Sequence, residues 1–114
     1  MKKIIILTST RADFGKMKSL IYALRKNKKK YSVTILITGM HMLAKFGNTY
    51  KEIFKHFRTG LIMFKNQKFG DPLEIILANT ISRLSKIFKK INPDLVITHG
   101  DRVETLATAI TGSL

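Results

Sequence analysis

The chain has 114 residues, of which 45% are hydrophobic, so it is long and apolar enough for one small domain rather than a disordered segment. It contains no cysteine, which excludes disulfide bonds and cysteine-based zinc sites. The net charge of +14 can attract nucleic acid, but the basic residues are scattered apart from a cluster at residues 26–30, so we interpret them as a solvated surface and expect no nucleic-acid partner.

The first predicted element is a strand over residues 4–7, whose unbroken apolar run is typical of a strand covered on both faces. The run is too short for a signal peptide or a membrane span, so we expect a cytoplasmic protein with no membrane partner. In the turn that follows, Ser9 or Thr10 can cap a helix and leave backbone N–H groups free for an anion. Arg11 is either a phosphate ligand or an ordinary surface arginine. The glycine-rich patterns of dinucleotide and ATP sites are absent.

Apolar residues with a period of 3.6 predict a helix after this turn, and a second strand follows over residues 33–37. His41 comes shortly after this strand, and a lone histidine at such a place is more often a structural residue than a ligand. Asn48 or Thr49 is predicted to cap the next helix, and Glu52 falls where it completes a capping box with Thr49.

The second half of the chain continues the alternation of strands and helices. A short strand leads into a polar loop, and a long amphipathic stripe then begins at a proline, which is favoured in the first turn of a helix. The predicted elements are a strand at 61–64, a loop at 65–71, a helix from 72 to 91, a strand at 95–97 and a helix that begins near 103.

Charged residues crowd the junction between the last predicted strand and the last predicted helix. His99, Asp101, Arg102 and Glu104 follow one another closely there. An acid, a base and a helix start at the carboxyl end of a strand indicate a site that holds an anion and moves a proton. A charged surface turn is the alternative, and for an isolated Gly-Asp turn it is the better interpretation.

The alternation predicts an α/β fold, Rossmann-like, with a parallel sheet and helices on both faces. The usual strand order 3-2-1-4 places the first and fourth strands side by side. We therefore expect the loops at Arg11, His41 and Asp101 to converge on one crevice, which favours a functional site over a surface turn.

Several short motifs occur in order along nearly the whole chain: Thr-Ser-Thr-Arg-Ala-Asp-Phe-Gly at 8–15, Thr-Gly-Met-His at 38–41, Phe-Gly-Asn-Thr at 46–49, Pro-Asp-Leu-Val-Ile at 93–97 and His-Gly-Asp-Arg at 99–102. In order and spacing these motifs resemble the hydrolysing UDP-N-acetylglucosamine 2-epimerases of sialic acid synthesis. The Arg-Ala-Asp and Gly-Asp-Arg forms look more like the hydrolysing branch than the non-hydrolysing one, which tends to have Arg-Pro-Glu and Gly-Asp-Thr.

The resemblance implies a two-domain fold like that of glycosyltransferases of the B type. Residues 1–114 would be only an incomplete N-terminal Rossmann-like domain, inactive alone, and the full-length protein would be a homo-oligomer. The implied reaction converts UDP-N-acetylglucosamine and water to N-acetylmannosamine and UDP, by elimination and hydration, without a cofactor. The alternatives are a hydrolysing 2-epimerase for a UDP-diacetamido-trideoxyhexose and a non-catalytic nucleotide-binding domain.

The same resemblance implies which residues do the chemistry. Elimination needs a group that abstracts a weakly acidic proton and groups that stabilise the departing diphosphate. The dispersed histidines give no cluster of metal ligands, so we expect no metal site. The implied roles are acid/base catalysis for Asp101, contact with UDP for Arg11, Ala12 and Arg102, and the lining of the sugar pocket for His41 and Glu104.

Overall fold

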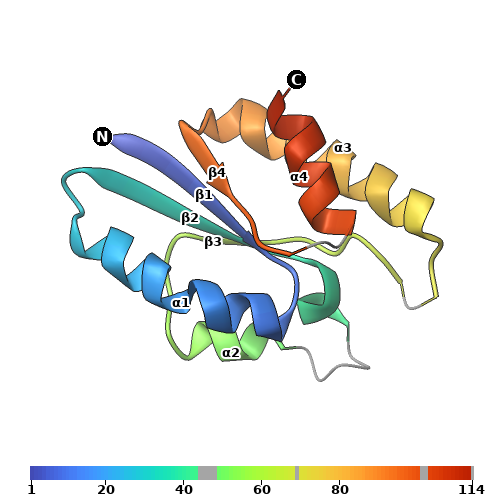
Figure 1. Cartoon of the computed structure of the whole chain (residues 1–114), viewed down its shortest axis with the longest axis horizontal. Helices are drawn as coiled ribbons and strands as arrows, with labels where there is room; N and C mark the ends of the chain where they lie inside the picture. Colours follow the sequence, from blue (N-terminus) through green and yellow to red (C-terminus); the bar gives the residue numbers. More distant parts are fainter. Residues whose placement is uncertain (44–48, 69, 101–102, 114) are drawn as a thin grey trace.

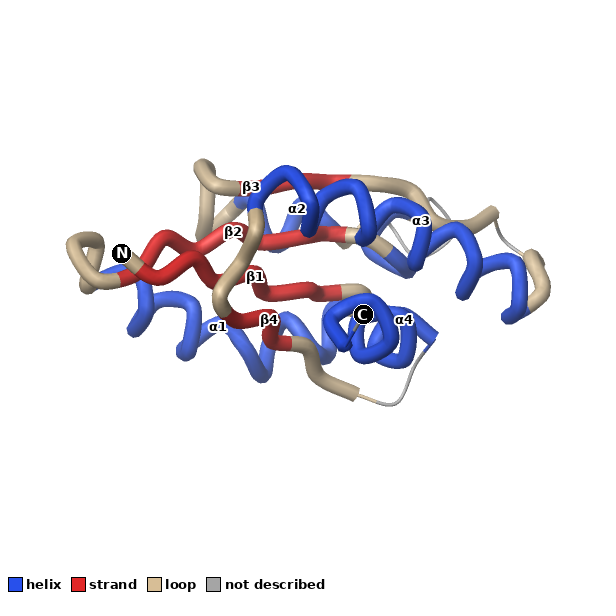
Figure 2. Tube along the Cα trace, turned by 90° about the horizontal axis from the view of Figure 1, so that it is seen from above, coloured by secondary structure: helices blue, strands red, loops and turns tan. Residues whose placement is uncertain are grey.

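The computed structural model describes residues 1–43, 49–68, 70–100 and 103–113. Its centre is a four-stranded parallel sheet with the strand order β3-β2-β1-β4, which confirms the predicted order (Figure 2). The strands are β1 (Lys2–Thr8), β2 (Tyr31–Ile37), β3 (Leu61–Met63) and β4 (Leu95–Ile97).

The helices cover both faces of this sheet, as predicted (Figure 1). Helices α1 and α2 lie against one face, and α3 and α4 lie against the other. In the described residues, none of the helices combines the length and the apolar character needed to cross a membrane. The helices are α1 (Arg11–Lys26), the 3₁₀ helix η1 (Gly39–Met42), α2 (Tyr50–Phe54), α3 (Leu73–Ile91) and α4 (Val103–Ser113).

Side chains of β1 alternate between two hydrophobic cores, because successive residues of a strand point to opposite faces of the sheet. Ile4 and Ile6 pack in the core formed with α1 and α2. Ile5 and Leu7 pack in the core formed with α3 and α4. Full burial of such a side chain contributes about 1.5–3 kcal/mol to the free energy of folding. The apolar run of β1 therefore favours a position for this strand in the middle of the sheet, where both of its faces are covered.

The predicted capping box at the start of α2 is wrong. Thr49 has helical backbone angles and makes no side-chain cap bond, because its Oγ1 lies 2.9 Å from His41 Nδ1 instead. Glu52 is paired with Lys55, whose Nζ lies 3.4 Å from its Oε2. The alternative cap, Asn48, lies outside the described residues.

Candidate functional site

The first turn of α1 is closed by the side chains of Thr10 and Asp13. Thr10 is the N-cap residue, and its Oγ1 accepts a hydrogen bond from the backbone N–H of Asp13 at 3.2 Å. The buried Asp13 carboxylate accepts bonds from the backbone N–H groups of Ser9 at 3.1 Å and of Thr10 at 3.0 Å. The N–H groups of Arg11 and Ala12 are left as first-turn donors that have no acceptor in the part of the chain that the structure describes.

Arg11 and Ala12 are both exposed at this end of α1. Unpaired N–H groups at a helix N-terminus carry partial positive charge and bind phosphate groups readily. The guanidinium of Arg11 belongs to the same turn and adds a permanent charge with paired donors. Both predicted UDP contacts therefore lie where an anionic ligand can reach them, and the contact itself stays a prediction.

His41 lies in η1, directly after β2, and its side chain is fully buried. Its Nε2 lies 2.9 Å from Thr8 Oγ1 and its Nδ1 lies 2.9 Å from Thr49 Oγ1, so both ring nitrogens have a partner. Burial lowers the pKa of His41 from 6.5 to about 4, and the charge of Asp13 offsets only part of this effect. His41 is therefore a neutral side chain that links three segments, and its contact with a sugar stays a prediction.

The burial of His41 makes the stability of the fold depend on pH. The unfolded chain binds a proton on this histidine below about pH 6.5, whereas the folded chain does so only near pH 4. Folding therefore becomes less favourable as the pH falls from 6.5 to about 4. Because one pKa unit corresponds to about 1.4 kcal/mol, up to roughly 3 kcal/mol of stability depends on His41 across this range.

We expect His41→Gln to flatten the loss of stability over this pH range, as measured by chemical denaturation at a series of pH values. The matched control is His56→Gln, because His56 is a partly exposed histidine whose Nδ1 lies 3.0 Å from Tyr22 Oη. The control keeps His41, so its stability should still fall as the pH is lowered from 6.5 to about 4. A His41→Gln curve that runs parallel to the wild-type curve would refute this explanation.

The loops after β1 and β2 meet the start of α4 at Gly39. This glycine has a φ of +63°, and a Cβ added to it would lie 2.7 Å from Ser9 Cβ and 2.8 Å from Glu104 Oε1. Glu104 is fully buried in the first turn of α4. The residues after β1 and β2 therefore lie against the first turn of α4. The expected convergence of Arg11, His41 and Asp101 on one crevice stays a prediction, because Asp101 lies outside the described residues.

A polar cluster that the sequence did not predict packs against Glu104. Asn66 is 1% exposed, and its Nδ2 donates hydrogen bonds to Glu104 Oε1 at 3.3 Å and to Thr80 Oγ1 at 2.9 Å. Among the described residues, Thr38 Oγ1, Asn66 Oδ1 and Gln67 Oε1 are buried without a hydrogen-bond partner. Because buried polar atoms are nearly always paired, we expect water or a ligand group to donate hydrogen bonds to these oxygens.

Two predicted site residues, Asp101 and Arg102, lie outside the described residues. The catalytic role of Asp101 and the UDP contact of Arg102 therefore stay predictions. The chain on either side is described: β4 leads into this junction, and the Oγ1 of Thr105 in α4 donates a hydrogen bond to the His99 carbonyl at 3.3 Å.

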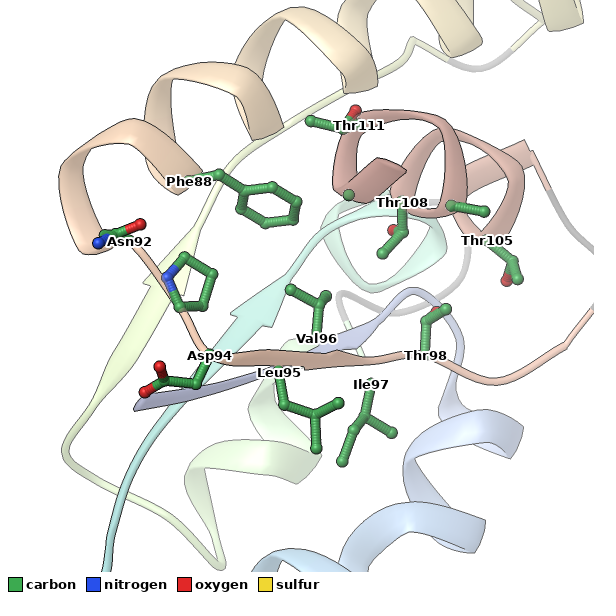
Figure 3. Close-up of a pocket in the computed structure, with 13 residues that line it drawn as sticks. Phe88, Asn92, Asp94, Leu95, Val96, Ile97, Thr98, Thr105, Thr108 and Thr111 are labelled. Atoms are coloured by element: carbon green, nitrogen blue, oxygen red, sulfur yellow. The ribbon is translucent and has the colours of Figure 1, made fainter. Parts of the chain in front are cut away.

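A groove of about 800 Å³ opens along β4, between the end of α3 and α4 (Figure 3). Val96 points toward the helices, whereas Leu95 and Ile97 point to the other face of the sheet. Asp94 is the one charged residue among those that line the groove in the described chain, and it lies at the amino end of β4. A largely apolar groove whose charged group is an acid does not suit a diphosphate, so we place the candidate site at the strand ends instead.

Comparison with known proteins identifies the family. The family model described as UDP-N-acetylglucosamine 2-epimerase matches residues 23–114. The chain belongs to this epimerase family. Over its whole length it is 43% identical to the UDP-N-acetylglucosamine 2-epimerase of Neisseria meningitidis serogroup B, of which it covers 30%. It is 34% identical to the GDP/UDP-N,N'-diacetylbacillosamine 2-epimerase (hydrolyzing) of Campylobacter jejuni, with 95% of this chain and 28% of that relative covered.

Solved structures of UDP-N-acetylglucosamine 2-epimerases have the same fold over this length. A crystal structure of one such enzyme matches with a TM-score of 0.80 and 25% identity, covering 98% of this chain and 30% of that protein. The enzyme from Neisseria meningitidis bound to UDP-GlcNAc matches with a TM-score of 0.78 and 25% identity, covering 98% of this chain and 29% of that protein. This epimerase-family chain thus spans about 30% of the length of its curated relatives, and it forms part of a glycosyltransferase-B-like fold.

Proposed function

We propose that this chain is the N-terminal part of a hydrolysing UDP-N-acetylglucosamine 2-epimerase whose active site is completed by a C-terminal domain. A base removes the proton from C2 of the sugar while the bond from C1 to the UDP oxygen breaks. Water then adds across the resulting double bond, which gives N-acetylmannosamine and free UDP. The relatives from Campylobacter jejuni and Legionella pneumophila carry the word hydrolyzing in their names, which supports this branch of the family.

The observation that carries the proposal is the close approach at Gly39. Ser9 and Gly39 follow the carboxyl ends of β1 and β2, and Glu104 lies in the first turn of α4, the helix after β4. A Cβ added to Gly39 would lie within 2.9 Å of atoms from both Ser9 and Glu104. Ligands of open parallel sheets bind beyond these strand ends. The exposed first turn of α1 begins two residues after Ser9, so a diphosphate bound there lies close to the charged start of α4.

Five of the six predicted residues have a role in this proposal, and the contact of the sixth, His41, with the sugar stays a prediction. Arg11 and the N–H group of Ala12 hold the diphosphate, together with Arg102. Asp101 moves the proton at C2. Glu104 is the predicted sugar-pocket residue of α4, and a hydrogen bond from Asn66 holds its buried carboxylate in place.

The decisive experiment incubates the full-length protein that contains this chain with UDP-N-acetylglucosamine and follows the products by ³¹P and ¹H NMR. We expect free UDP and N-acetylmannosamine in equal amounts, with solvent deuterium at C2 when the reaction is run in heavy water. UDP-N-acetylmannosamine without free UDP would instead indicate the non-hydrolysing reaction. UDP binding without turnover would indicate a nucleotide-binding domain.

A UDP-diacetamido-trideoxyhexose is the second candidate substrate. It is favoured by the names of the Campylobacter and Legionella relatives, at 34% and 32% identity, against 43% for the Neisseria enzyme. Both nucleotide sugars belong in the same assay, and the one with the higher kcat/KM is the substrate.

A further inference from the structure

One chain of buried side chains connects three segments of the candidate site. Thr49 Oγ1, at the start of α2, lies 2.9 Å from His41 Nδ1, and His41 Nε2 lies 2.9 Å from Thr8 Oγ1 at the end of β1. Thr8 Oγ1 is hydrogen-bonded in turn to Asp13 Oδ1 in the first turn of α1. Thr8 and His41 are fully buried, and Asp13 is 6% exposed.

The chemistry of these groups fixes the direction in which the protons are donated. A carboxylate only accepts hydrogen bonds, so the hydroxyl of Thr8 donates its single proton to Asp13. The Thr10 carbonyl, 3.5 Å from Thr8 Oγ1, is too distant to compete. We therefore assign the proton of neutral His41 to Nε2, which donates to the Thr8 hydroxyl, so that Nδ1 accepts from the Thr49 hydroxyl.

The second carboxylate oxygen of Asp13, Oδ2, connects this chain of hydrogen bonds to the backbone just before α1. Asp13 Oδ2 accepts hydrogen bonds from the N–H groups of Ser9 and Thr10 and from Ser9 Oγ. These bonds occupy the backbone donors just before α1, whereas those of the exposed residues Arg11 and Ala12 have no acceptor in the described residues. The orientation of the Asp13 carboxylate thus decides which backbone donors an incoming anion meets.

We propose that Thr8 is a positioning residue: by joining His41 to Asp13 it holds the first turn of α1 in the geometry that receives the diphosphate of the nucleotide sugar. This inference rests on the proposed function, because it assumes that UDP binds at Arg11 and Ala12. Thr8 acts through Asp13 and is too deeply buried to contact the ligand.

The test compares two substitutions of nearly matched size in the full-length protein. Thr8→Val keeps the shape and removes the hydroxyl, whereas Thr8→Ser keeps the hydroxyl. We expect Thr8→Val to weaken UDP binding, measured by calorimetry, by about tenfold or more, as for loss of a hydrogen bond to a charged group. Thr8→Ser should stay within about threefold of the wild type, because the bond to the charged group is kept.

Thr111→Val is the matched control, because Thr111 Oγ1 donates to the carbonyl of Ala107 within α4, away from the first turn of α1. It should leave UDP affinity unchanged. A Thr8→Val protein that binds UDP as tightly as the wild type would overturn the inference and leave the proposed function intact. A wild-type protein that neither binds UDP nor turns over the substrate would overturn the proposed function instead.

A second measurement keeps the inference testable if Thr8→Val does not fold. The ¹⁵N chemical shifts of the His41 ring in the wild-type protein report which nitrogen carries the proton. We expect the proton on Nε2 at neutral pH, both with and without UDP. A proton on Nδ1 would reverse the direction of the bonds and overturn the role assigned to Thr8.

Discussion

Replacing Asp101 with asparagine is expected to lower the rate of UDP release by about 10²–10⁴-fold, the usual contribution of a general acid or base. Asparagine has nearly the same shape, but it cannot take up a proton at neutral pH. The substitution therefore removes proton transfer at C2 and leaves the turn before α4 otherwise similar. Steady-state kinetics on the full-length protein measure the loss, and circular dichroism with thermal melting checks that the fold is kept.

The matched control for Asp101→Asn is Asp94→Asn. Asp94 directly precedes β4, whereas Asp101 comes after it. The Oδ2 of Asp94 accepts a hydrogen bond from the backbone N–H of Lys3 at 2.7 Å. An asparagine keeps an acceptor oxygen at that position, so turnover should stay near the wild-type value. If Asp101→Asn turns over substrate as fast as Asp94→Asn, Asp101 has no catalytic role.

Gly39→Ala is expected to be the most damaging small substitution in the described part of the chain. The alanine would have to adopt a φ of +63° and place its Cβ 2.7 Å from Ser9 Cβ and 2.9 Å from the Ser9 carbonyl oxygen. Backbone strain and overpacking each cost about 1–3 kcal/mol, so we expect a loss of roughly 2–6 kcal/mol in the free energy of unfolding. Urea denaturation measures that loss.

Gly70→Ala separates the two contributions to this loss. Gly70 also has a positive φ, of +90°, but an added Cβ there would meet no atom within 4 Å. This control should therefore show only the cost of backbone strain. Equal losses for the two variants would mean that the close approach between Ser9, Gly39 and Glu104 contributes nothing to stability.

The fold was predictable because each strand is short, apolar and separated from the next by a helical pattern. β1 is buried on both faces, so its run from Ile4 to Leu7 has no polar interruption that would suggest an exposed sheet. β4 was predicted with the bounds that the structure gives. The parallel order then follows from right-handed crossovers and needs no information about particular side-chain contacts.

The buried polar network could not be predicted with the same rules. Thr10 with Asp13 and Thr49 with Glu52 both match the capping-box pattern, but only the first pair makes the bonds. The difference comes from tertiary structure, because the hydroxyl of Thr49 is hydrogen-bonded to His41, a residue outside the local capping-box pattern. The Thr10–Asp13 pair does carry a local signal in the sequence, a hydroxyl three residues before a carboxylate.

Asn66 and Gln67 were missed for a different physical reason. Amide side chains are usually exposed, so a segment that contains them between a strand and a helix is interpreted as a surface loop. The structure instead buries both side chains, and Asn66 is hydrogen-bonded to Thr80 of α3 and Glu104 of α4. No periodicity in the sequence distinguishes these two situations.

The most direct test of the central claim is a crystal structure of the full-length protein with UDP bound. We predict that the diphosphate lies within hydrogen-bond distance of the Arg11 guanidinium and the Ala12 N–H group, with the Asp101 carboxylate across the same cleft. A diphosphate bound elsewhere, or Arg11 and Asp101 at opposite ends of the sheet, would contradict it.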